Sequence, residues 1–524
     1  MKKHLCLALA ALTFAACDKE TDSVGPVEKG EMEQSYVAIT LSADDLSTRA
    51  DDGVYDAGRD EERAVNSVFV FFFKDGEPFA VSPTEEKPTE NTVRNNFLQV
   101  ELTGEGEATT NVSDVKDAVL VLENYQGEYP NQIAALLNWT PTRPSYTFDE
   151  LREEVSALGD DTDGYVMSNA VYADKTGKTI DAIDLTVKNI GKSAEDAKAN
   201  PITIYVERVA AKVMFTAKDN GKFAVEKEVD GKPVYAQITG FELFNDYEES
   251  WLIKRINPLW EDLGFNWNDP DWNRSYWATS LETPFVDNTF AWETNNTAIN
   301  GYVYCGENTR EWTIADDVRT KVIVKAQLVD VDGNPFEVVQ WNGKEYVGEG
   351  DLKTVVANSL SSTYLFSTDG GNTFTGLLPE DIECATPSVD EAKAYEVYFK
   401  LSAAGQAKSW YSLEGGVYTP IADADAFNNI LKNVNPALVY KNGMTYYYTD
   451  IKHLGAPSSI ARYGVVRNHV YKVNISDITG YGTPVYNGNT GFITPEAPED
   501  YVTYVSAEIN VLTWRVVEHD YPLD

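Results

Sequence analysis

The clearest fold signal in this chain is the run Val65-Asn66-Ser67-Val68-Phe69-Val70-Phe71-Phe72-Phe73, which is followed closely by Asp75-Gly76. β-Branched and aromatic side chains favour extended backbone, and an Asp-Gly pair is typical of the tight turn in a β-hairpin. The sequence therefore predicts a strand over 65–73 that ends in a hairpin turn.

Runs of the same kind recur along the chain, each short and bounded by turn residues. They favour an all-β fold with minor helix, built from β-sandwiches, over alternating strands and helices. The runs lie at 97–102, 117–122, 164–172, 202–206, 209–217, 322–331, 394–401, 444–448, 469–475 and 502–517.

Two helices are predicted. Thr147 and Glu150 have the spacing of a capping box ahead of an apolar stripe, and Gly159 is placed to end the helix, so a helix is expected over 147–158. The second candidate lies at 424–432. Both are expected to pack on a sheet.

The overall charge is strongly acidic. The 524 residues include 43 Lys and Arg against 83 Asp and Glu, a formal net charge of −40, which argues against a nucleic-acid partner. Hydrophobic residues make up 43%, enough for a packed core, and the length favours two domains. A polar stretch at 188–201, followed by a new series of strands, predicts the boundary near Arg208.

Residues suited to catalysis or metal binding are scarce. The chain has four His and four Cys, and Cys6 and Cys17 lie in its first 17 residues. Cys305 and Cys384 alone form neither a disulfide scaffold nor a thiolate cluster, and whether they pair with each other stays open. No nucleophile elbow, phosphate loop or zinc helix occurs. We therefore predict no enzyme activity, no catalytic residue, no metal and no cofactor.

Three segments each allow two interpretations. Residues 160–164 and 330–334 combine Asp with Gly or Asn, which would suit a calcium site or a tight turn. Turns are favoured, because neither segment has the flanking helices of an EF-hand. The five Trp between Trp251 and Trp277 would suit stacking on a glycan or packing in a core, and packing is favoured.

The N-terminus predicts a lipid-anchored precursor. A short basic start precedes an apolar run at 5–16, which is too short to span a bilayer and ends in Ala15-Ala16 directly before Cys17. This pattern is typical of a bacterial lipoprotein signal peptide, with Cys17 as the lipidated residue. Residues 18–34 are polar and suit a tether, and a strand is expected at Tyr36-Val37-Ala38-Ile39-Thr40-Leu41.

A single basic residue, Arg49, lies in the acidic loop over 42–53 that follows this strand. An exposed Arg in such a loop is either one more solvated charge or a cleavage site for a trypsin-like protease.

The chain also ends in a strand signal. Apolar residues alternate with polar ones through Val505, Ala507, Ile509 and Val511, in a run that continues to Val517. A long apolar strand at the end of a chain is unusual in a soluble monomer, and a terminal strand is easily lent to a neighbouring molecule.

Taken together, these features resemble a Bacteroidales fimbrillin, and in particular the stalk subunits of the short, Mfa-type fimbriae. The resemblance spans almost the whole chain and depends on the order and placement of short segments. These are the leader ending at Cys17, the strand Tyr36–Leu41 followed by Arg49-Ala50, the segment Tyr205–Val213, Glu307-Asn308-Thr309, the segment Tyr463–Tyr471, and Val511-Leu512-Thr513-Trp514-Arg515-Val516.

The resemblance implies two tandem transthyretin-like β-sandwich domains and a defined maturation. It implies a signal peptide over 1–17, a propeptide over 18–49 with a tether and a removable first strand, and sandwich domains over 50–208 and 209–524. Cleavage between Arg49 and Ala50 would remove the strand Tyr36–Leu41 and open a groove. The C-terminal strand of another subunit would fill that groove, with candidate donor residues Leu512, Trp514, Val516, Val517, Tyr521 and Leu523.

The same resemblance implies a structural stalk subunit of a surface fimbrium that supports adhesion. Its partners would be other copies in a head-to-tail filament, anchor and tip subunits, a maturation protease, and host or bacterial surface receptors. The lipidated precursor would lie at the outer membrane and the mature form in the fimbrium. Two alternatives stay open, a fimbrial tip or anchor subunit and a surface glycan-binding lipoprotein or glycosidase.

Overall fold

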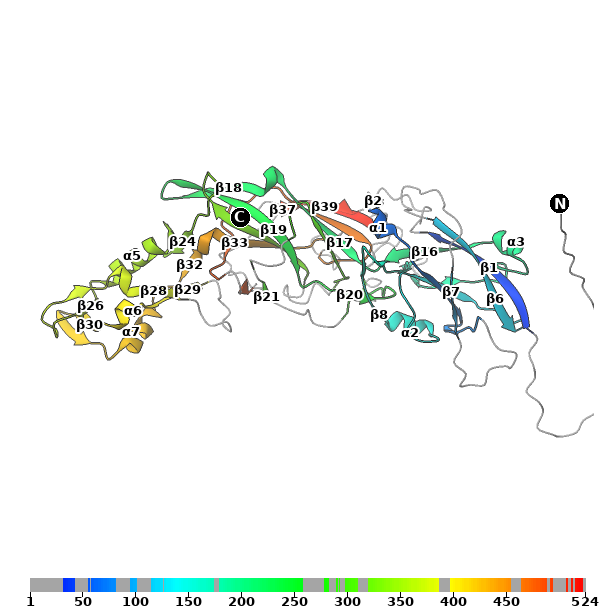
Figure 1. Ribbon diagram of the computed structural model, residues 1–524, viewed down its shortest axis with the longest axis horizontal. Coiled ribbons are helices and arrows are strands. Elements are labelled where there is room, and N and C mark those ends of the chain that lie inside the picture. The colour runs from blue at the N-terminus through cyan, green and yellow to red at the C-terminus, as the bar shows by residue number, and fades with distance from the viewer. Residues whose placement is uncertain are drawn as a thin grey trace, which may run out of the picture.

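A computed structural model of the chain describes most of its central part. The described residues are 32–42, 55–56, 58–81, 95–100, 115–125, 127–173, 179–257, 278–281, 289–290, 292, 297–309, 319–385, 396–453, 463–487, 491–492, 506–507, 510–511 and 514–521. These residues form an elongated molecule made mostly of β-sheet, as the sequence predicts (Figure 1). Within them, no helix is both long enough and apolar enough to cross a bilayer.

A ten-stranded sheet occupies one end of the molecule (Figure 1). Its main path is β15-β1-β16-β11-β7-β3-β4, with β6, β14 and β5 attached to β1, β7 and β3. The strands are β1 (Met32–Ser42), β3 (Val68–Lys74), β4 (Glu77–Pro78), β5 (Phe97–Gln99), β6 (Val115–Tyr125), β7 (Gln132–Leu137), β11 (Met167–Asn169), β14 (Ile183–Asp184), β15 (Ile190–Gly191) and β16 (Ile202–Arg208).

Strand β3 forms most of the predicted 65–73 run, and it explains why residues 68–73 are apolar throughout. Val68, Val70 and Phe72 point into one hydrophobic cluster, whereas Phe69, Phe71 and Phe73 point into another. Both faces of the strand are therefore buried, which removes the usual alternation with polar residues. Asp75 and Gly76 form the predicted turn, both with positive φ.

The chain then passes to two further sheets. They enclose one shared core that includes Phe215, Ala236, Val324 and Tyr471. A seven-stranded sheet contains β2 (Tyr55–Asp56), β17 (Ala211–Ala217), β22 (Tyr302–Cys305), β34 (His469–Ile475), β37 (Ser506–Ala507), β38 (Asn510–Val511) and β39 (Trp514–Tyr521). A five-stranded sheet contains β18 (Lys222–Val229), β19 (Lys232–Phe244), β23 (Lys321–Val329), β33 (Met444–Asp450) and β35 (Thr483–Pro484).

An insertion between the neighbouring strands β23 and β33 has its own hydrophobic cluster and lies at the opposite end of the molecule from β1 and β6 (Figure 1). One sheet holds β24 (Val338–Trp341), β25 (Lys344–Val347), β28 (Ile382–Ala385), β29 (Glu396–Leu401) and β32 (Ala437–Tyr440). The other holds β26 (Tyr364–Ser367), β27 (Thr375–Gly376), β30 (Ser409–Glu414) and β31 (Val417–Pro420). Its helices are α5 (Gly348–Leu360), α6 (Ala403–Gln406) and α7 (Ala424–Leu431).

The remaining elements are small. The helices are α1 (Asp60–Arg63), α2 (Phe148–Glu153) and α3 (Ala194–Lys198). Two-stranded pairings join β8 (Val155–Ala157) to β20 (Glu249–Trp251), β9 (Gly159–Asp160) to β10 (Gly164–Tyr165), β12 (Tyr172–Ala173) to β13 (Thr179–Ile180), and β21 (Thr289–Phe290) to β36 (Gly491–Phe492).

The helix predictions are partly correct. The helix predicted at 424–432 is confirmed as α7, and Thr147 forms the predicted capping box with Glu150. The predicted helix over 147–158 is wrong beyond Glu153, because residues 155–157 pair with β20 from a distant part of the chain. Gly159 accordingly lies in a hairpin strand with positive φ rather than at a helix end.

Candidate functional site

The strand β1 lies inside the ten-stranded sheet and not at its edge. It pairs antiparallel with β6 along its full length, from Met32↔Tyr125 to Ser42↔Val115, and parallel with β16 from Ile39↔Ile202 to Ser42↔Tyr205. Among the described strands, β6 has no other ladder partner than β1. The predicted strand at 36–41 is therefore the element that connects β6 to the rest of the sheet.

The inward side chains of β1 are buried in the core beneath the sheet. Val37 and Ile39 are 0% and 1% exposed, and they belong to the same hydrophobic cluster as Leu120 of β6 and Ile204 of β16. On the inward face of β6, Ala118, Leu120 and Leu122 are all buried. Together β6 and β16 would form an apolar groove if β1 were absent.

One end of this row is polar. Asn124 follows Leu122 on the inward face of β6 and is 1% exposed, and Ser35 of β1 is 4% exposed. Ser35 Oγ donates a hydrogen bond to Asn124 Oδ1 (2.6 Å), and Asn124 Nδ2 donates to the carbonyl oxygen of Glu128 (2.8 Å). The second bond fixes which side of the amide faces β1, because Nδ2 is the donor and Oδ1 the acceptor.

The C-terminal strand β39 lies in this chain's own seven-stranded sheet. It runs parallel to β34 from His469↔Arg515 to Ile475↔Tyr521, and its other edge pairs with β2, β37 and β38. The candidate donor residues Trp514, Val516, Val517 and Tyr521 belong to β39, whereas Leu512 and Leu523 lie outside the described residues.

The short strand β2 brings the N-terminal part of the chain onto this C-terminal strand. Tyr55 pairs with Arg515 and Asp56 with Trp514. Strand β1 ends at Ser42 and β2 begins at Tyr55, so the segment 43–54 links the strand that fills the groove to a strand that pairs with β39. Cys17, Arg49 and Ala50 lie outside the described residues.

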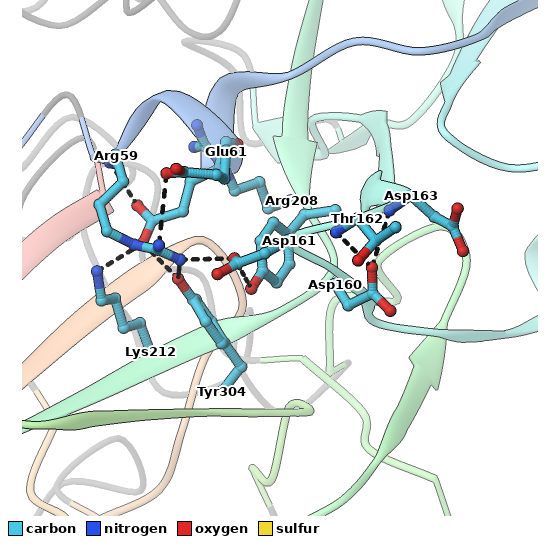
Figure 2. A network of polar contacts seen from close by, with 11 residues as sticks. Arg59, Glu61, Asp160, Asp161, Thr162, Asp163, Arg208, Lys212 and Tyr304 are labelled. Atoms are coloured by element: carbon cyan, nitrogen blue, oxygen red, sulfur yellow. Dashed lines mark hydrogen bonds and ion pairs between the residues drawn. The ribbon is translucent and has the colours of Figure 1, made fainter.

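Helix α1 follows β2 and holds the chain at the junction of the two large sheets through a polar network (Figure 2). Glu62 is fully buried and accepts hydrogen bonds from Lys212 Nζ (2.5 Å) and from the Tyr304 hydroxyl. Arg59 donates to Asp161 Oδ1 (2.6 Å) and to the Tyr304 hydroxyl (2.9 Å). The network therefore ties α1 to β17, β22 and the β9–β10 turn.

The electrostatics of this network favour an ionised Glu62. Burial raises the pKa of its carboxyl, but the hydrogen bonds from Lys212 and Tyr304 outweigh that effect and lower the pKa from 4.5 to about 2. The pKa of Asp161 is also lowered, chiefly by its bond with Arg59. Both carboxylates therefore hold α1 in place at neutral pH.

Three of the segments that carry the fimbrillin resemblance meet at the same junction. Arg467 is fully buried, pairs with Glu307 (3.1 Å) and donates to the carbonyl oxygen of Trp251 (2.6 Å). Arg208 donates to Asn468 Oδ1 (3.3 Å) and to the carbonyl oxygen of Glu62 (2.8 Å). These segments are distant in the sequence, and their shared role is to join the parts of the molecule.

The structure also describes parts of the three segments that allowed two interpretations, namely residues 160–164, residues 330–334 and the Trp-rich segment from Trp251 to Trp277. Asp160 Oδ1 accepts from the backbone N–H of Thr162 and Asp163, and Asp330 Oδ1 accepts from that of Asn334, so both acidic segments are hydrogen-bonded turns. In the Trp-rich segment, the guanidinium carbon of Arg255 lies 3.8 Å from the ring centre of Trp251. The other four residues, Trp260, Trp267, Trp272 and Trp277, lie outside the described residues.

Cys305 and Cys384, whose pairing the sequence left open, are both free thiols and belong to separate hydrophobic clusters. Cys305 is buried in the core shared by the two large sheets of the C-terminal half, and Cys384 packs against the insertion's cluster. They do not pair with each other.

Several residues of the site were not found from the sequence. Glu62 lies in the charged run Asp60-Glu61-Glu62-Arg63, which has the composition of a solvated surface, and Ser35 and Asn124 belong to no motif. The one available signal was that Asn124 continues the period-2 row Ala118, Leu120, Leu122, a pattern that places a polar side chain on a buried face.

Comparisons with known proteins point to one family. Residues 438–520 match the family model "Major fimbrial subunit protein type IV, Fimbrillin, C-terminal", and this segment includes β33, β34 and most of β39. The resemblance to fimbrillins that the sequence predicts is confirmed by this match. The members are fimbrial subunits, which are structural proteins and not enzymes. A search of curated proteins finds no match.

Solved structures with similarity to this chain include three from the Bacteroidales group. A putative cell adhesion protein from Bacteroides eggerthii DSM 20697 is 11% identical, with 95% of this chain and 100% of that chain covered and a TM-score of 0.37. A fimbrilin (fimA) from Porphyromonas gingivalis W83 is 11% identical, with 95% and 97% covered and a TM-score of 0.33. The tip fimbrial protein Mfa3 from Porphyromonas gingivalis is 12% identical, with 84% and 95% covered and a TM-score of 0.30.

Proposed function

We propose that this chain, whose residues 438–520 match a fimbrillin C-terminal model, is a fimbrial subunit that forms the stalk of a cell-surface fimbrium by donor-strand exchange. In this proposal the precursor is exported as a lipoprotein modified at Cys17, and a protease cuts after Arg49. Cleavage releases β1, and the C-terminal strand of a second copy takes its place. The mature subunit then belongs to a filament that supports adhesion.

The observation that carries the proposal is the position of β1. It lies between β6 and β16 with Val37 and Ile39 buried, yet it precedes the proposed cleavage site in the chain. Its removal would uncover the apolar rows of β6 and β16 and leave backbone N–H and C=O groups of both strands unpaired. An incoming strand restores the ladder and reburies apolar side chains, at about 1.5–3 kcal/mol for each large one.

The connection between β1 and β2 supports cleavage as the trigger. Before cleavage, one continuous segment runs from the groove strand β1 to β2, which pairs with the candidate donor strand β39. A cut after Arg49 falls within residues 43–54 and separates β1 from β2. The groove strand is then free to leave while α1 keeps the new N-terminal segment attached to the junction through Glu62.

The polymerising contact is head-to-tail, because the groove and the donor strand are different surfaces of one chain. A head-to-tail contact builds an open filament where its rotation does not close into a ring, and we propose the open form here. Partners would therefore be further copies, together with anchor and tip subunits, the maturation protease and surface receptors. The precursor would lie at the outer membrane and the mature protein in the fimbrium.

The proposal is tested by the N-terminus of the mature surface protein and by the variant Arg49→Ala. We expect wild-type subunits in fimbriae to begin at Ala50, and Arg49→Ala cells to hold only lipidated, unpolymerised precursor. The matched control is Arg63→Ala, which removes an arginine of α1 that is 31% exposed and lies outside the proposed cleavage loop, and it should leave filaments intact. Filaments of normal length from Arg49→Ala cells would contradict the proposal, and a wild-type surface protein that starts at Cys17 would indicate an anchor subunit.

A further inference from the structure

We propose that residues 189–200 form a latch over the groove, and that Gly191 is the positioning residue that gives the latch its shape. The latch consists of β15, the helix α3 and the turns beside them. This inference rests on the proposed donor-strand exchange and names the element that would hold the incoming strand. In the precursor the latch pairs with β1, and in the filament it would pair with the strand that replaces β1.

The wall of the groove opposite β6 has two parts that depend on β1 to different degrees. Strand β16 pairs with β1 from Ile39 onward, whereas β15 pairs with Tyr36 and Val37. Helix α3 lies against β1 at the same end of the sheet (Figure 1). Among the described strands, β15 has β1 as its single ladder partner, but β16 also pairs with β11. When β1 leaves, β16 would therefore keep a partner and the latch would lose its ladder.

The latch is held together by hydrogen bonds of its own. At its neck, Asn189 Nδ2 donates to the carbonyl oxygen of Asn200 (3.3 Å). Ser193 Oγ caps α3 by accepting from the backbone N–H of Asp196 (3.1 Å), and the N–H of Ala197 donates to the carbonyl oxygen of Ser193 (3.1 Å). These bonds do not involve β1, so the latch can keep its shape while its pairing with the groove strand is broken and made again.

Gly191 is the point where α3 packs directly on the backbone of β15. A Cβ added at this residue would lie 2.5 Å from the backbone nitrogen of Ala197 and 2.8 Å from the carbonyl oxygen of Ser193. It would also lie 2.9 Å from Cβ of Asp196. Such a close approach of two backbone segments requires glycine. Any side chain at 191 would push α3 away from β15 and disturb the pairing of β15 with Tyr36 and Val37.

The first test measures amide hydrogen exchange in the purified full-length precursor with Gly191→Ala. We expect the amides of residues 189–200 to exchange about tenfold faster or more, because the latch opens more often, while those of the central strand β7 keep their wild-type rates. The matched control is Gly376→Ala in the insertion, where an added Cβ would lie 2.6 Å from the carbonyl oxygen of Ser361. This variant carries a comparable clash and should leave exchange in the latch unchanged.

The second test measures the rate of monomer release from intact fimbriae in warm detergent. We expect Gly191→Ala to speed release about tenfold, the effect of one or two ladder hydrogen bonds, and Gly376→Ala to release at the wild-type rate. A glycine needed only for local folding would change exchange in the latch but not release. If Gly191→Ala does not fold, Ser193→Ala removes the cap of α3 and should speed both processes about fivefold.

Two results would overturn the inference while the proposed function stands. Wild-type exchange in the latch of both variants would show that Gly191 does not shape it. Faster exchange in the latch together with wild-type release would show that the latch holds β1 but not the incoming strand. If wild-type subunits cut after Arg49 form no filaments at all, the proposed function fails and the role of the latch in the filament fails with it. The exchange measurement on the precursor still decides the role of Gly191 in that case.

Discussion

At the scale of single residues, the junction depends on charges that are buried together with their partners. Glu62 alone would be expelled from a protein interior, because an ion loses its hydration there. Lys212 and the Tyr304 hydroxyl replace that hydration, which is why the pKa of Glu62 falls despite its burial. Such a pair is sensitive to loss of one member, since the other is then left as an uncompensated buried charge.

This arrangement predicts acid sensitivity. The carboxyl has a pKa of about 2 when folded and 4.5 ordinarily, so its contribution to stability is complete above pH 4.5 and is lost as the pH falls towards 2. Glu62→Gln should lower the free energy of unfolding at pH 7 by on the order of 3 kcal/mol and flatten its decline below pH 4.5. Chemical denaturation across that pH range measures both effects.

The matched control is Glu61→Gln. Glu61 is half exposed and its pair with Arg59 spans 3.4 Å, so its loss should change stability by less than about 1 kcal/mol at any pH. An equal loss of stability from the two variants would contradict a special role for Glu62.

At the scale of elements, β39 has two possible positions in the proposed cycle. In the single chain it pairs with β34 on one side and with β2 and β38 on the other. In the filament it would leave these strands for the groove of a neighbour. Strands that exchange in this way must lose one ladder before they gain another, so in the proposed cycle the single-chain state would act as a barrier to premature assembly.

Deletion of residues 512–524 tests this element. We expect the shortened chain to fold and to be cut after Arg49 but to stay monomeric, because the donor is missing while β1 and the core of the other sheets remain. Gel electrophoresis without boiling, after maturation, measures the loss of the ladder of multimers. Retained ladders would show that the donor strand lies elsewhere in the chain.

At the scale of the whole molecule, the elongated shape separates the proposed assembly groove from the insertion between β23 and β33. The groove strand β1 lies at one end, and the insertion with β26, β30 and β31 lies at the other (Figure 1). The insertion leaves the sheet after β23 and returns to it at the neighbouring strand β33, so it adds a separate hydrophobic cluster without interrupting that sheet. Changes there should leave polymerisation intact.

A tag placed between Gly415 and Gly416 tests this separation. Both glycines are exposed in the β30–β31 turn with positive φ, and no atom of the described residues lies within 4 Å of a Cβ added at either position. We expect tagged fimbriae of normal length that an anti-tag antibody labels along their whole length in electron micrographs. Label confined to one end of the filament would indicate a tip subunit in place of a stalk subunit.

The sequence alone predicted the mostly β fold, because local patterns report burial directly. The run 65–73 with Asp75-Gly76 indicated a strand that ends in a hairpin turn, and Thr147 with Glu150 indicated a helix start, since each effect involves residues that are close in the chain. The same locality explains the incorrect helix at 155–158, where pairing with β20 outweighed a local helical pattern.

The tertiary structure decided what lies next to what. The segments around Arg208, Glu307 and Arg467 were recognisable one by one, but only the fold brings them into a single buried junction. Ser35 and Glu62 look like ordinary surface residues in the sequence, because polarity alone does not report burial, and Asn124 is marked only by its place in an apolar period-2 row. Their roles depend on long-range strand pairing and packing, in which partners lie 89 to 242 residues apart.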